Sequence, residues 1–506
     1  MGQGHVEIED KYDVDADAEV TGLDGLPGVE VVAAPVEHEL EATYHDTSDL
    51  ALARTGVTLR RRTGGEDEGW HLKLPIEKGR QELQEPVEGE EIPAFFVDVV
   101  SGLSAGEPLR PVATIRTRRT VHRLLDAHGD PLAEVTDDQV TALRSGSAAP
   151  PRVWREWEVE LVGGDDDLLA AAAEHLQGLG AVPSSSGSKL ARALGPDLPP
   201  RREQPWPGAD EPACLLLETR VREQLGTLRR YDPAVRADLH GGVHRMRIAI
   251  RRIRSALATY RPLLDREVTD PVRDELKWLG GELGPARDTE VQRDRMQKAF
   301  AGLFEEDPAL IRGTARTTAE AEMAATYEHA HEWAVQALRS ERYAALLRRL
   351  DDLVAAPPWS DQAERTVDDV ARRRVKHDYK RLVGRVDDAL SIDDPAHRGE
   401  AMHDARKAAK RVRYAAEPLV PTYGKPAKRF VKAMKKVAST LGDHHDAIVA
   451  DDVLRDLGDA AAAKGEHAFT FGVLQARETE RAREEEQRFE EAWSRASSKK
   501  LRRWLR

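Results

Sequence analysis

The feature that most constrains the fold is a repeat in the second half of the chain. "VHRMRIAIRRIRSALATY" (243–260) aligns with "MHDARKAAKRVRYAAEPL" (402–419) at an offset of 159 residues, and "LGPARD" (283–288) aligns with "LGDHHD" (441–446) at an offset of 158. Two matched segments at nearly one offset indicate a duplicated unit. Alanine, leucine, arginine and glutamate dominate around both copies, which predicts helices. We therefore expect an all-α domain over 213–506, built from copies at about 213–355 and 365–506.

Each repeated helix is predicted to carry an apolar seam beside a stripe of cations. A solvated face with ion pairs at i,i+4 is the alternative, but few acidic residues stand at the required offsets. Clustered cations repel one another unless an anion binds between them. We therefore predict that the cations bind an extended polyanion as a ligand, and a chain of phosphates suits their spacing best. No aromatic residues alternate with the cations as base stacking would need, so nucleic acid is disfavoured. The predicted polyphosphate ligands are His244, Arg247, Arg251, Arg254, His403, Arg406, Lys410, Arg413, Lys428 and Lys432.

A proline-rich stretch, 196–212, separates this half from a first domain over 1–195 and reads as a semi-stiff linker. In the first domain, segments such as "VEIEDKY", "HLKLP" and "REWEVEL" alternate as strands do. The first 200 residues hold 18 Lys and Arg against 38 Asp and Glu, whereas the remaining 306 hold 58 against 52. Such a split in charge suggests two parts with different tasks.

The predicted strands carry apolar residues on one face and charges on the other. Near the start, Val6 and Ile8 alternate with Glu7, Glu9 and Lys11. Alternation alone leaves two interpretations open. A sheet with a solvated charged face is the more usual one, and a barrel with a charged interior is the other.

The charged residue types suit the chemistry of phosphates. Carboxylates bind Mg²⁺ or Mn²⁺ through hard oxygen atoms, and lysine and arginine bind phosphate oxygens. A metal ion that bridges phosphates while cations absorb charge is what phosphoryl transfer requires. The pattern Glu7-x-Glu9-x-Lys11 is weak evidence by itself, since chance predicts it roughly twice in a chain of this composition.

Composition favours a cytoplasmic protein. The sequence has no apolar run near the roughly 18 residues that a membrane span needs and no secretory signal at its start. Its single cysteine, Cys214, excludes an intramolecular disulfide.

The first domain resembles the CYTH family of triphosphate tunnel enzymes, named after adenylate cyclase and thiamine triphosphatase. The resemblance rests on Glu7-x-Glu9-x-Lys11, "YHDT" followed by "TLRRR", "HLKLP", "TIRTRR", "AEVTDDQV", "WEVEL" and "SSSGSKL", in that order over 5–195. The second domain resembles a CHAD domain, a duplicated helical module whose hallmark is histidines and basic residues. Both domains in this order resemble a bacterial CYTH–CHAD protein.

The resemblance implies an α+β chain with an eight-stranded antiparallel barrel around a tunnel, followed by a duplicated helical bundle. It implies that the charges point inward, that Mg²⁺ or Mn²⁺ is the cofactor, and that the metal ligands are Glu7, Glu9, Glu158 and Glu160, with Glu134, Asp138 and Glu156 as further candidates. Phosphate would be bound by Lys11, Arg60, Arg62, Lys73, Arg116, Arg118 and Lys189, and the catalytic residues would be Glu7, Glu9, Lys11, Lys73 and Glu158.

The expected activity is hydrolysis of inorganic triphosphate, with polyphosphate bound by the helical domain and with polyphosphate granules as a cytoplasmic location. Two alternatives remain open. One is an enzyme that acts on a nucleotide or thiamine, such as adenylate cyclase or a thiamine or nucleoside triphosphatase, and the other is a polyphosphate-binding protein without activity.

Overall fold

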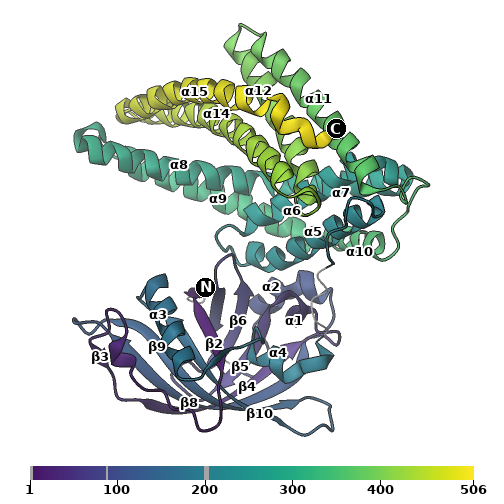
Figure 1. The fold of residues 1–506 in the computed structure, drawn as a ribbon. Coiled ribbons are helices and arrows are strands. Elements are labelled where there is room, and N and C mark those ends of the chain that lie inside the picture. Colours follow the sequence, from purple (N-terminus) through teal and green to yellow (C-terminus); the bar gives the residue numbers. More distant parts are fainter. Residues whose placement is uncertain (1–3, 87–88, 199–203) are drawn as a thin grey trace. The chain divides into compact units, whose positions relative to one another are not determined.

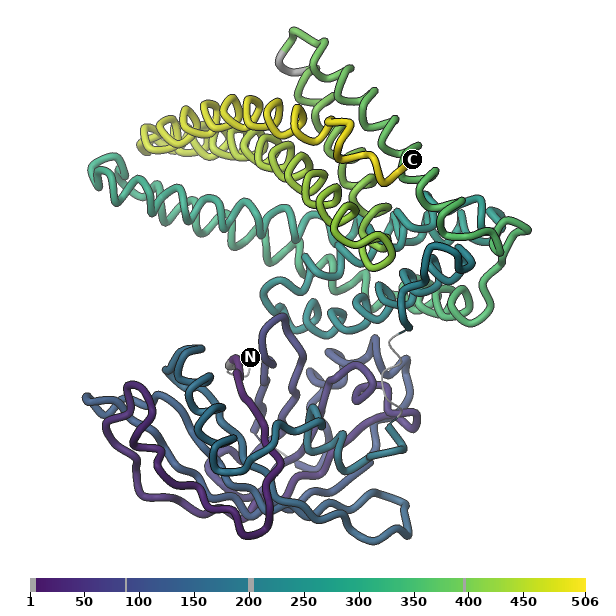
Figure 2. Tube along the Cα trace, in the orientation of Figure 1, coloured from purple at the N-terminus to yellow at the C-terminus, as the bar shows by residue number. Residues whose placement is uncertain are grey.

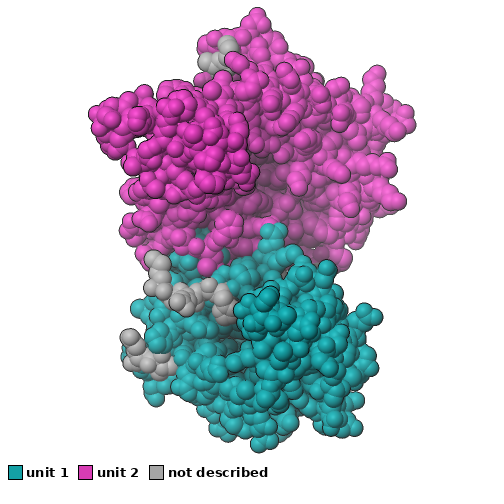
Figure 3. Space-filling model, turned by 90° about the vertical axis from the view of Figure 1, so that its left-hand side faces the viewer, with its two compact units in different colours: residues 1–202, 232–237 teal, residues 203–231, 238–506 magenta. Residues whose placement is uncertain are grey.

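The computed structural model describes residues 4–86, 89–198 and 204–506, which fall into two compact units. The sheet unit comprises Met1–Arg202 and Asp232–Ala237, and the helical unit comprises Glu203–Tyr231 and Asp238–Arg506 (Figure 3). Residues 199–203 of the predicted linker lie outside the described residues. In the part of the chain that is described, no helix is long and apolar enough to cross a membrane.

One antiparallel sheet forms the sheet unit (Figure 1). Its strands pair in the order β1-β7-β6-β5-β4-β8-β9-β10-β2-β11, with β3 on β8. They are β1 (Gly4–Glu7), β2 (Glu9–Asp13), β3 (Val31–Val32), β4 (Val36–Asp46), β5 (Thr58–Thr63), β6 (Gly69–Pro75), β7 (Arg80–Glu85), β8 (Arg110–Leu125), β9 (Pro131–Arg144), β10 (Arg152–Leu161) and β11 (Val182–Pro183).

The sheet curls because β1 and β2, which lie at or next to its opposite edges, are consecutive in the sequence. Only Ile8 separates β1, which pairs with β7, from β2, which pairs with β10. The predicted α+β class is confirmed, and the sheet is antiparallel and curled as a half-barrel where an antiparallel barrel was predicted. The predicted count of eight strands is not exact, since the described sheet has eleven, of which β3 and β11 are two residues long.

The convex face of β2, β9 and β10 is apolar and covered. Trp157 and Val159 are fully buried against Leu168 and Leu176 of α3 (Asp166–Gly178). Because that face is occupied, the charged residues that alternate with Trp157 and Val159 point to the concave side of the sheet. The interpretation that alternation alone favoured, a solvated charged face, is therefore wrong.

Three short helices complete the sheet unit: α1 (Ala51–Thr55), α2 (Ala94–Ser104) and α4 (Lys189–Leu194). Leu190, Ala193 and Leu194 of α4 pack in one buried cluster with Tyr44 of β4 and Ile115 of β8. This packing fixes the first residue of α4, Lys189, beside the concave face of the sheet.

The helical unit follows the predicted pattern of long helices, of which α14 and α15 run side by side (Figure 2). Every apolar residue of the two predicted seams is buried: Val243, Met246, Ile250, Ile253 and Leu257 in the first copy, and Met402, Ala405, Ala409 and Val412 in the second. The helices are α5 (Ala213–Arg236), α6 (Gly242–Thr259), α7 (Arg266–Glu282), α8 (Gly284–Glu306), α9 (Ala315–Arg339), α10 (Glu341–Ala355), α11 (Val367–Leu390), α12 (Pro395–Ala416), α13 (Val420–Tyr423), α14 (Lys425–Ala463) and α15 (Phe469–Ala496).

The two copies differ where the second matched segment lies. "LGPARD" spans the break between α7 and α8, and Pro285 stands in the first turn of α8. "LGDHHD" lies inside the 39-residue helix α14. Proline lacks the N–H and clashes with the preceding turn, so one copy needs two helices where the other has one.

Candidate functional site

The concave side of the sheet encloses a cavity of about 290 Å³. Among the described residues, eight carboxylates and eight Lys or Arg side chains line it, so the charges balance. The carboxylates are Glu7, Glu9, Glu66, Asp67, Glu82, Glu134, Glu158 and Glu160, and the cations are Lys11, Arg60, Arg62, Lys73, Arg80, Arg119, Arg123 and Lys189.

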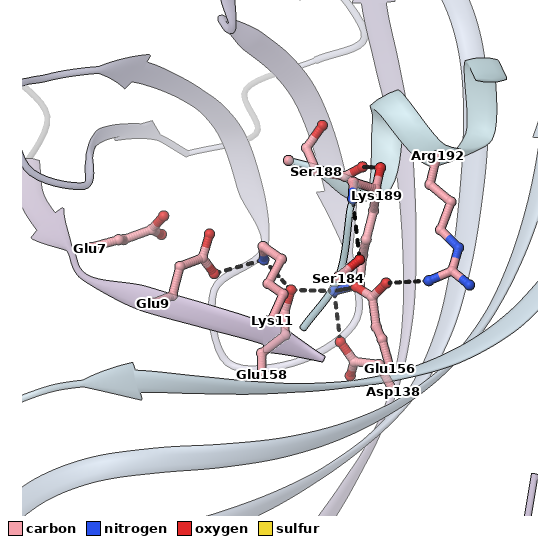
Figure 4. A network of polar contacts seen from close by, with 12 residues as sticks. Glu7, Glu9, Lys11, Asp138, Glu156, Glu158, Ser184, Ser188, Lys189 and Arg192 are labelled. Atoms are coloured by element: carbon pink, nitrogen blue, oxygen red, sulfur yellow. Dashed lines mark hydrogen bonds and ion pairs between the residues drawn. The ribbon is translucent and has the colours of Figure 1, made fainter. Parts of the chain in front are cut away.

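The first strand segment places three of these groups on one face, as its sequence predicted. Lys11 lies between Glu9, at 2.8 Å, and Glu158, with which it forms a short contact (Figure 4). Burial opposes the charge on Lys11, but Glu158 and Glu9 outweigh it and raise the pKa of Lys11. Lys11 is therefore a fixed positive charge at neutral pH.

A second group gathers on β1, β6 and β7. Lys73 Nζ lies 2.7 Å from both carboxylate oxygens of Glu7 and 3.7 Å from Glu82. Burial raises the pKa of Glu7 to about 8, although Lys73 opposes the shift. Burial would also raise the pKa of Glu82, but His71, Lys73 and Arg60 outweigh burial and hold that pKa far below its usual value. The pKa values of these two neighbouring carboxyl groups are thus shifted in opposite directions.

Arginines close the cavity further along the sheet. Arg60 lies 3.4 Å from the Tyr44 hydroxyl and 3.5 Å from Glu82, and Arg62 donates to Asp67 at 2.8 Å. Burial, and to a smaller extent Arg60, lower the pKa of Arg62 to about 10. Both guanidinium groups stay charged near pH 7.

A buried acidic cluster lies where β9 and β10 pair. Asp138, Glu156 and Glu158 each offer a carboxylate oxygen, and these oxygens lie within 4.8 Å of one another. Oxygen donors at this spacing are what a hard divalent cation uses. Burial would raise the pKa of Glu158, but Lys11, Lys189 and Arg119 outweigh it and hold the pKa well below its usual value.

The cavity lining includes most predicted site residues but not Asp138 and Glu156, which lie in the buried acidic cluster, nor Arg116 and Arg118. Arg116 and Arg118 point to the outer face, where they donate to Glu41 at 2.6 Å and to Glu39 at 3.1 Å. Their predicted place in the tunnel is wrong, because side chains alternate along β8 and those of Ile115, Thr117 and Arg119 face inward.

Six charged residues of the cavity lining were not predicted from the sequence: Glu66, Asp67, Arg80, Glu82, Arg119 and Arg123. Arg119 pairs with Asp138 across β8 and β9, Glu82 stands opposite Lys73 across β6 and β7, and Arg80 lines the cavity. "TIRTRR" contains Arg119, which shares its parity with Ile115 and Val121, but parity alone does not show which face of the sheet is inward. Nothing local in "RQELQE" singles out Glu82.

The helical unit has a groove of about 630 Å³ where both repeats meet. Nine Lys or Arg and two carboxylates line it among the described residues, so its lining is strongly positive. The cations are Arg247, Arg251, Arg254, Arg273, Arg287, Arg406, Lys407, Lys410 and Arg411, and the carboxylates are Asp288 and Asp446.

Repeat-related histidines also line the groove. His244 and His403 have buried Nδ1 atoms without a hydrogen-bond partner in the described residues. Burial and neighbouring cations lower the pKa of both histidines to about 4. Burial, Arg406 and Arg251 lower the pKa of Lys410 to about 7. An anion in the groove would relieve this crowding.

Three predicted polyphosphate ligands do not line this groove. Arg413 turns to Glu417, at 3.2 Å, and covers the ring of Tyr414. Lys428 and Lys432 are exposed on α14. The remaining predicted ligands, His244, Arg247, Arg251, Arg254, His403, Arg406 and Lys410, all line the groove.

Comparisons with known proteins agree with this division. The CYTH domain family matches residues 5–194 and the CHAD domain family matches residues 219–455. The uncharacterised protein MT2285 of Mycobacterium tuberculosis (strain CDC 1551 / Oshkosh) is 37% identical over 506 residues, covering 95% of each chain.

Two solved structures resemble parts of the chain. PptA from Streptomyces chartreusis is 21% identical, with a TM-score of 0.47, and the match covers 56% of this chain and 99% of that one. The CHAD domain from the plant Ricinus communis is 26% identical, with a TM-score of 0.45, and the match covers 58% of this chain and 96% of that one.

Proposed function

The chain belongs to the family of proteins that join a CYTH domain to a CHAD domain, and from this premise we propose that its sheet unit is a metal-dependent hydrolase of inorganic triphosphate. The observation that carries the proposal is the enclosed cavity with balanced, alternating carboxylates and cations. A protein that only bound anions would have no use for eight carboxylates in the same cavity.

The charge balance implies a metal ion. A triphosphate that entered a neutral lining would leave several buried negative charges uncompensated, which is costly. A divalent ion held by carboxylates supplies the missing charge, and we propose Mg²⁺, or Mn²⁺, bound by Glu7, Glu9 and Glu160, with Glu158 and Glu134 close by. When bound, the ion neutralises phosphate oxygens and lowers the pKa of a coordinated water.

The cations would hold the substrate. We assign phosphate contacts to Lys11, Lys73, Arg60 and Arg62, as the sequence predicted, and add Arg119 in place of Arg116 and Arg118. Arg119 donates Nε and Nη2 to carboxylates, so its Nη1 hydrogens are available to a phosphate oxygen. These groups orient the triphosphate so that a water attacks a terminal phosphorus in line with the leaving oxygen.

The cavity favours a compact substrate over a nucleotide. Its volume of about 290 Å³ lies at the lower end of small-molecule pockets. Tyr44 is the one Phe, Tyr or Trp among the described residues that line it, and its hydroxyl faces Arg60. Inorganic triphosphate therefore fits better than the substrates of adenylate cyclases, thiamine triphosphatases or nucleoside triphosphatases.

The helical unit would bind polyphosphate in its positive groove. Its lining needs no metal ion to attract a polyanion, because nine cations face two carboxylates. Binding there would raise the local concentration of chain ends for the sheet unit, which is a tethering effect. The proposal includes the division of tasks between residues 1–195 and 213–506, and a cytoplasmic location at polyphosphate granules.

The test is phosphate release by the purified chain with Mg²⁺, on tripolyphosphate, long-chain polyphosphate, ATP and thiamine triphosphate. We expect the fastest turnover on tripolyphosphate, its loss in Glu9→Gln, and its retention in Glu39→Gln, a matched change on the outer face. Faster turnover of ATP or thiamine triphosphate would overturn the substrate. No turnover, with polyphosphate binding retained, would make the chain a binding protein.

A further inference from the structure

The acidic cluster of Asp138, Glu156 and Glu158 already holds a cation that belongs to the chain. Lys189 Nζ lies 2.8 Å from Asp138, 2.7 Å from Glu156 and 2.8 Å from Glu158 (Figure 4). An ammonium group has three N–H donors. The three carboxylates thus surround the ammonium group as ion pairs, and Glu156 Oε1 has no hydrogen-bond partner among the described residues.

The distances suit an ammonium group and not a small metal ion. Charge-assisted N–H···O contacts are about 2.7–2.9 Å long, whereas Mg²⁺ requires oxygens at about 2.0–2.1 Å in octahedral geometry. A metal ion in this position would require the three carboxylates to move inward and Lys189 to leave.

The negative charge of the cluster is also compensated by cations of the chain, without a metal ion. Arg119 donates to Asp138 through Nε at 2.8 Å and Nη2 at 2.6 Å, and to Glu158 at 2.8 Å. With Lys11 on Glu158 and Arg192 at 3.6 Å from Glu156, four cations face the three carboxylates. A divalent ion added here would bury two uncompensated positive charges, which carries a large desolvation cost.

The fold holds Lys189 in this position. It is the first residue of α4, whose start is capped by Ser188, with Oγ accepting from the Ala191 amide at 3.1 Å. The next residue, Leu190, is buried, and it anchors the helix in the core of the sheet unit. The side chain of Lys189 is itself only 11% exposed.

We propose that the ammonium of Lys189 replaces a divalent ion in the Asp138–Glu156–Glu158 cluster, so that the cavity binds its metal at Glu7, Glu9 and Glu160 and not here. The inference rests on the proposed metal dependence of the sheet unit. Lys189 is then a positioning residue that holds three carboxylates, and not a ligand of the substrate.

The test counts Mn²⁺ ions bound by the full chain, by titration with electron paramagnetic resonance detection of free Mn²⁺. We expect Asp138→Asn and Glu156→Gln to leave the wild-type number unchanged and Glu9→Gln to reduce it by one. Lys189→Met should add one site, which Asp138→Asn in the same chain removes again. Lys78→Met, an exposed lysine paired with Asp166 in the same unit, is the matched control and should add none.

A wild-type count that falls in Asp138→Asn or Glu156→Gln would overturn the inference, as would a folded Lys189→Met that gains no site. The Asp138 and Glu156 variants keep the test decisive if Lys189→Met does not fold. The count is independent of turnover. Absence of phosphate release would thus contradict the proposed function while the number of Mn²⁺ sites still tested the role of Lys189.

Discussion

Replacing Lys410 with arginine should remove most of the pH dependence of polyphosphate binding between pH 7 and pH 9. Burial, Arg406 and Arg251 lower the pKa of Lys410 from 10.5 to about 7, and Asp446 opposes them. A bound phosphate chain supplies the missing anion and returns the pKa toward 10.5. Binding therefore takes up a proton above pH 7, and the affinity falls as the pH rises.

The size of the effect follows from the two pKa values. If binding restores the pKa fully, linkage predicts that the affinity falls about 5-fold from pH 7 to pH 8 and about 9-fold from pH 8 to pH 9. Below about pH 6 the contribution of Lys410 levels off, because the side chain is charged in both states. Arginine keeps its charge throughout this range, so Lys410→Arg should bind with nearly constant affinity.

The assay is a binding titration with long-chain polyphosphate, whose few terminal groups contribute little titration of their own. Ionic strength must be held fixed, since salt screens the attraction. Lys435→Arg, an exposed residue of α14 outside the groove lining, is the control and should keep the wild-type slope. The reasoning fails if the wild type binds equally well at pH 7 and pH 9, or if Lys410→Arg retains the slope.

Three further perturbations test other parts of the structure. Arg119→Ala should raise the KM for tripolyphosphate about 10- to 100-fold, which corresponds to the loss of one charged hydrogen bond. Arg116→Ala, on the outer face, should change the KM less than about 2-fold. Equal effects of the two changes in steady-state kinetics would contradict the orientation of β8. Removal of divalent ions with a chelator should abolish phosphate release but leave polyphosphate binding intact, and loss of both would refute the division of tasks. Trp157→Ala should lower the free energy of unfolding by about 3–5 kcal/mol through the cavity that it creates. The control is Val153→Ala, at a residue that is 75% exposed, which should leave urea denaturation almost unchanged. A small effect of the Trp157 change would show that the convex face is not a packed core.

The helical unit could be predicted further from the sequence than the sheet unit. The apolar seam and the stripe of cations in α6 and α12 follow from the spacing of residues along a single helix, which is local information. The seam of α6, from Val243 to Leu257, is buried as predicted. The exception is Arg413, whose place beside Glu417 and Tyr414 depends on the turn that follows α12.

In the sheet unit, alternation predicted strands but not which face is inside. On β8 both faces carry arginines, so "TIRTRR" does not show by itself whether Arg118 or Arg119 points inward. That choice depends on neighbouring strands: Glu39 of β4 meets Arg118 outside, and Asp138 of β9 meets Arg119 inside. Pairing of residues far apart in sequence is not contained in local periodicity.

The net charge of −14 does not oppose the binding of polyanions, because charge acts locally. The groove of the helical unit has a surplus of cations, so the phosphate chain that we propose for it would be attracted directly, and salt would weaken that attraction. The cavity of the sheet unit is balanced and buried, so its affinity for a triphosphate depends on the charge that a divalent ion brings. If both proposals hold, the chain would bind a long polyanion at all metal concentrations and act on a short one only when metal is present.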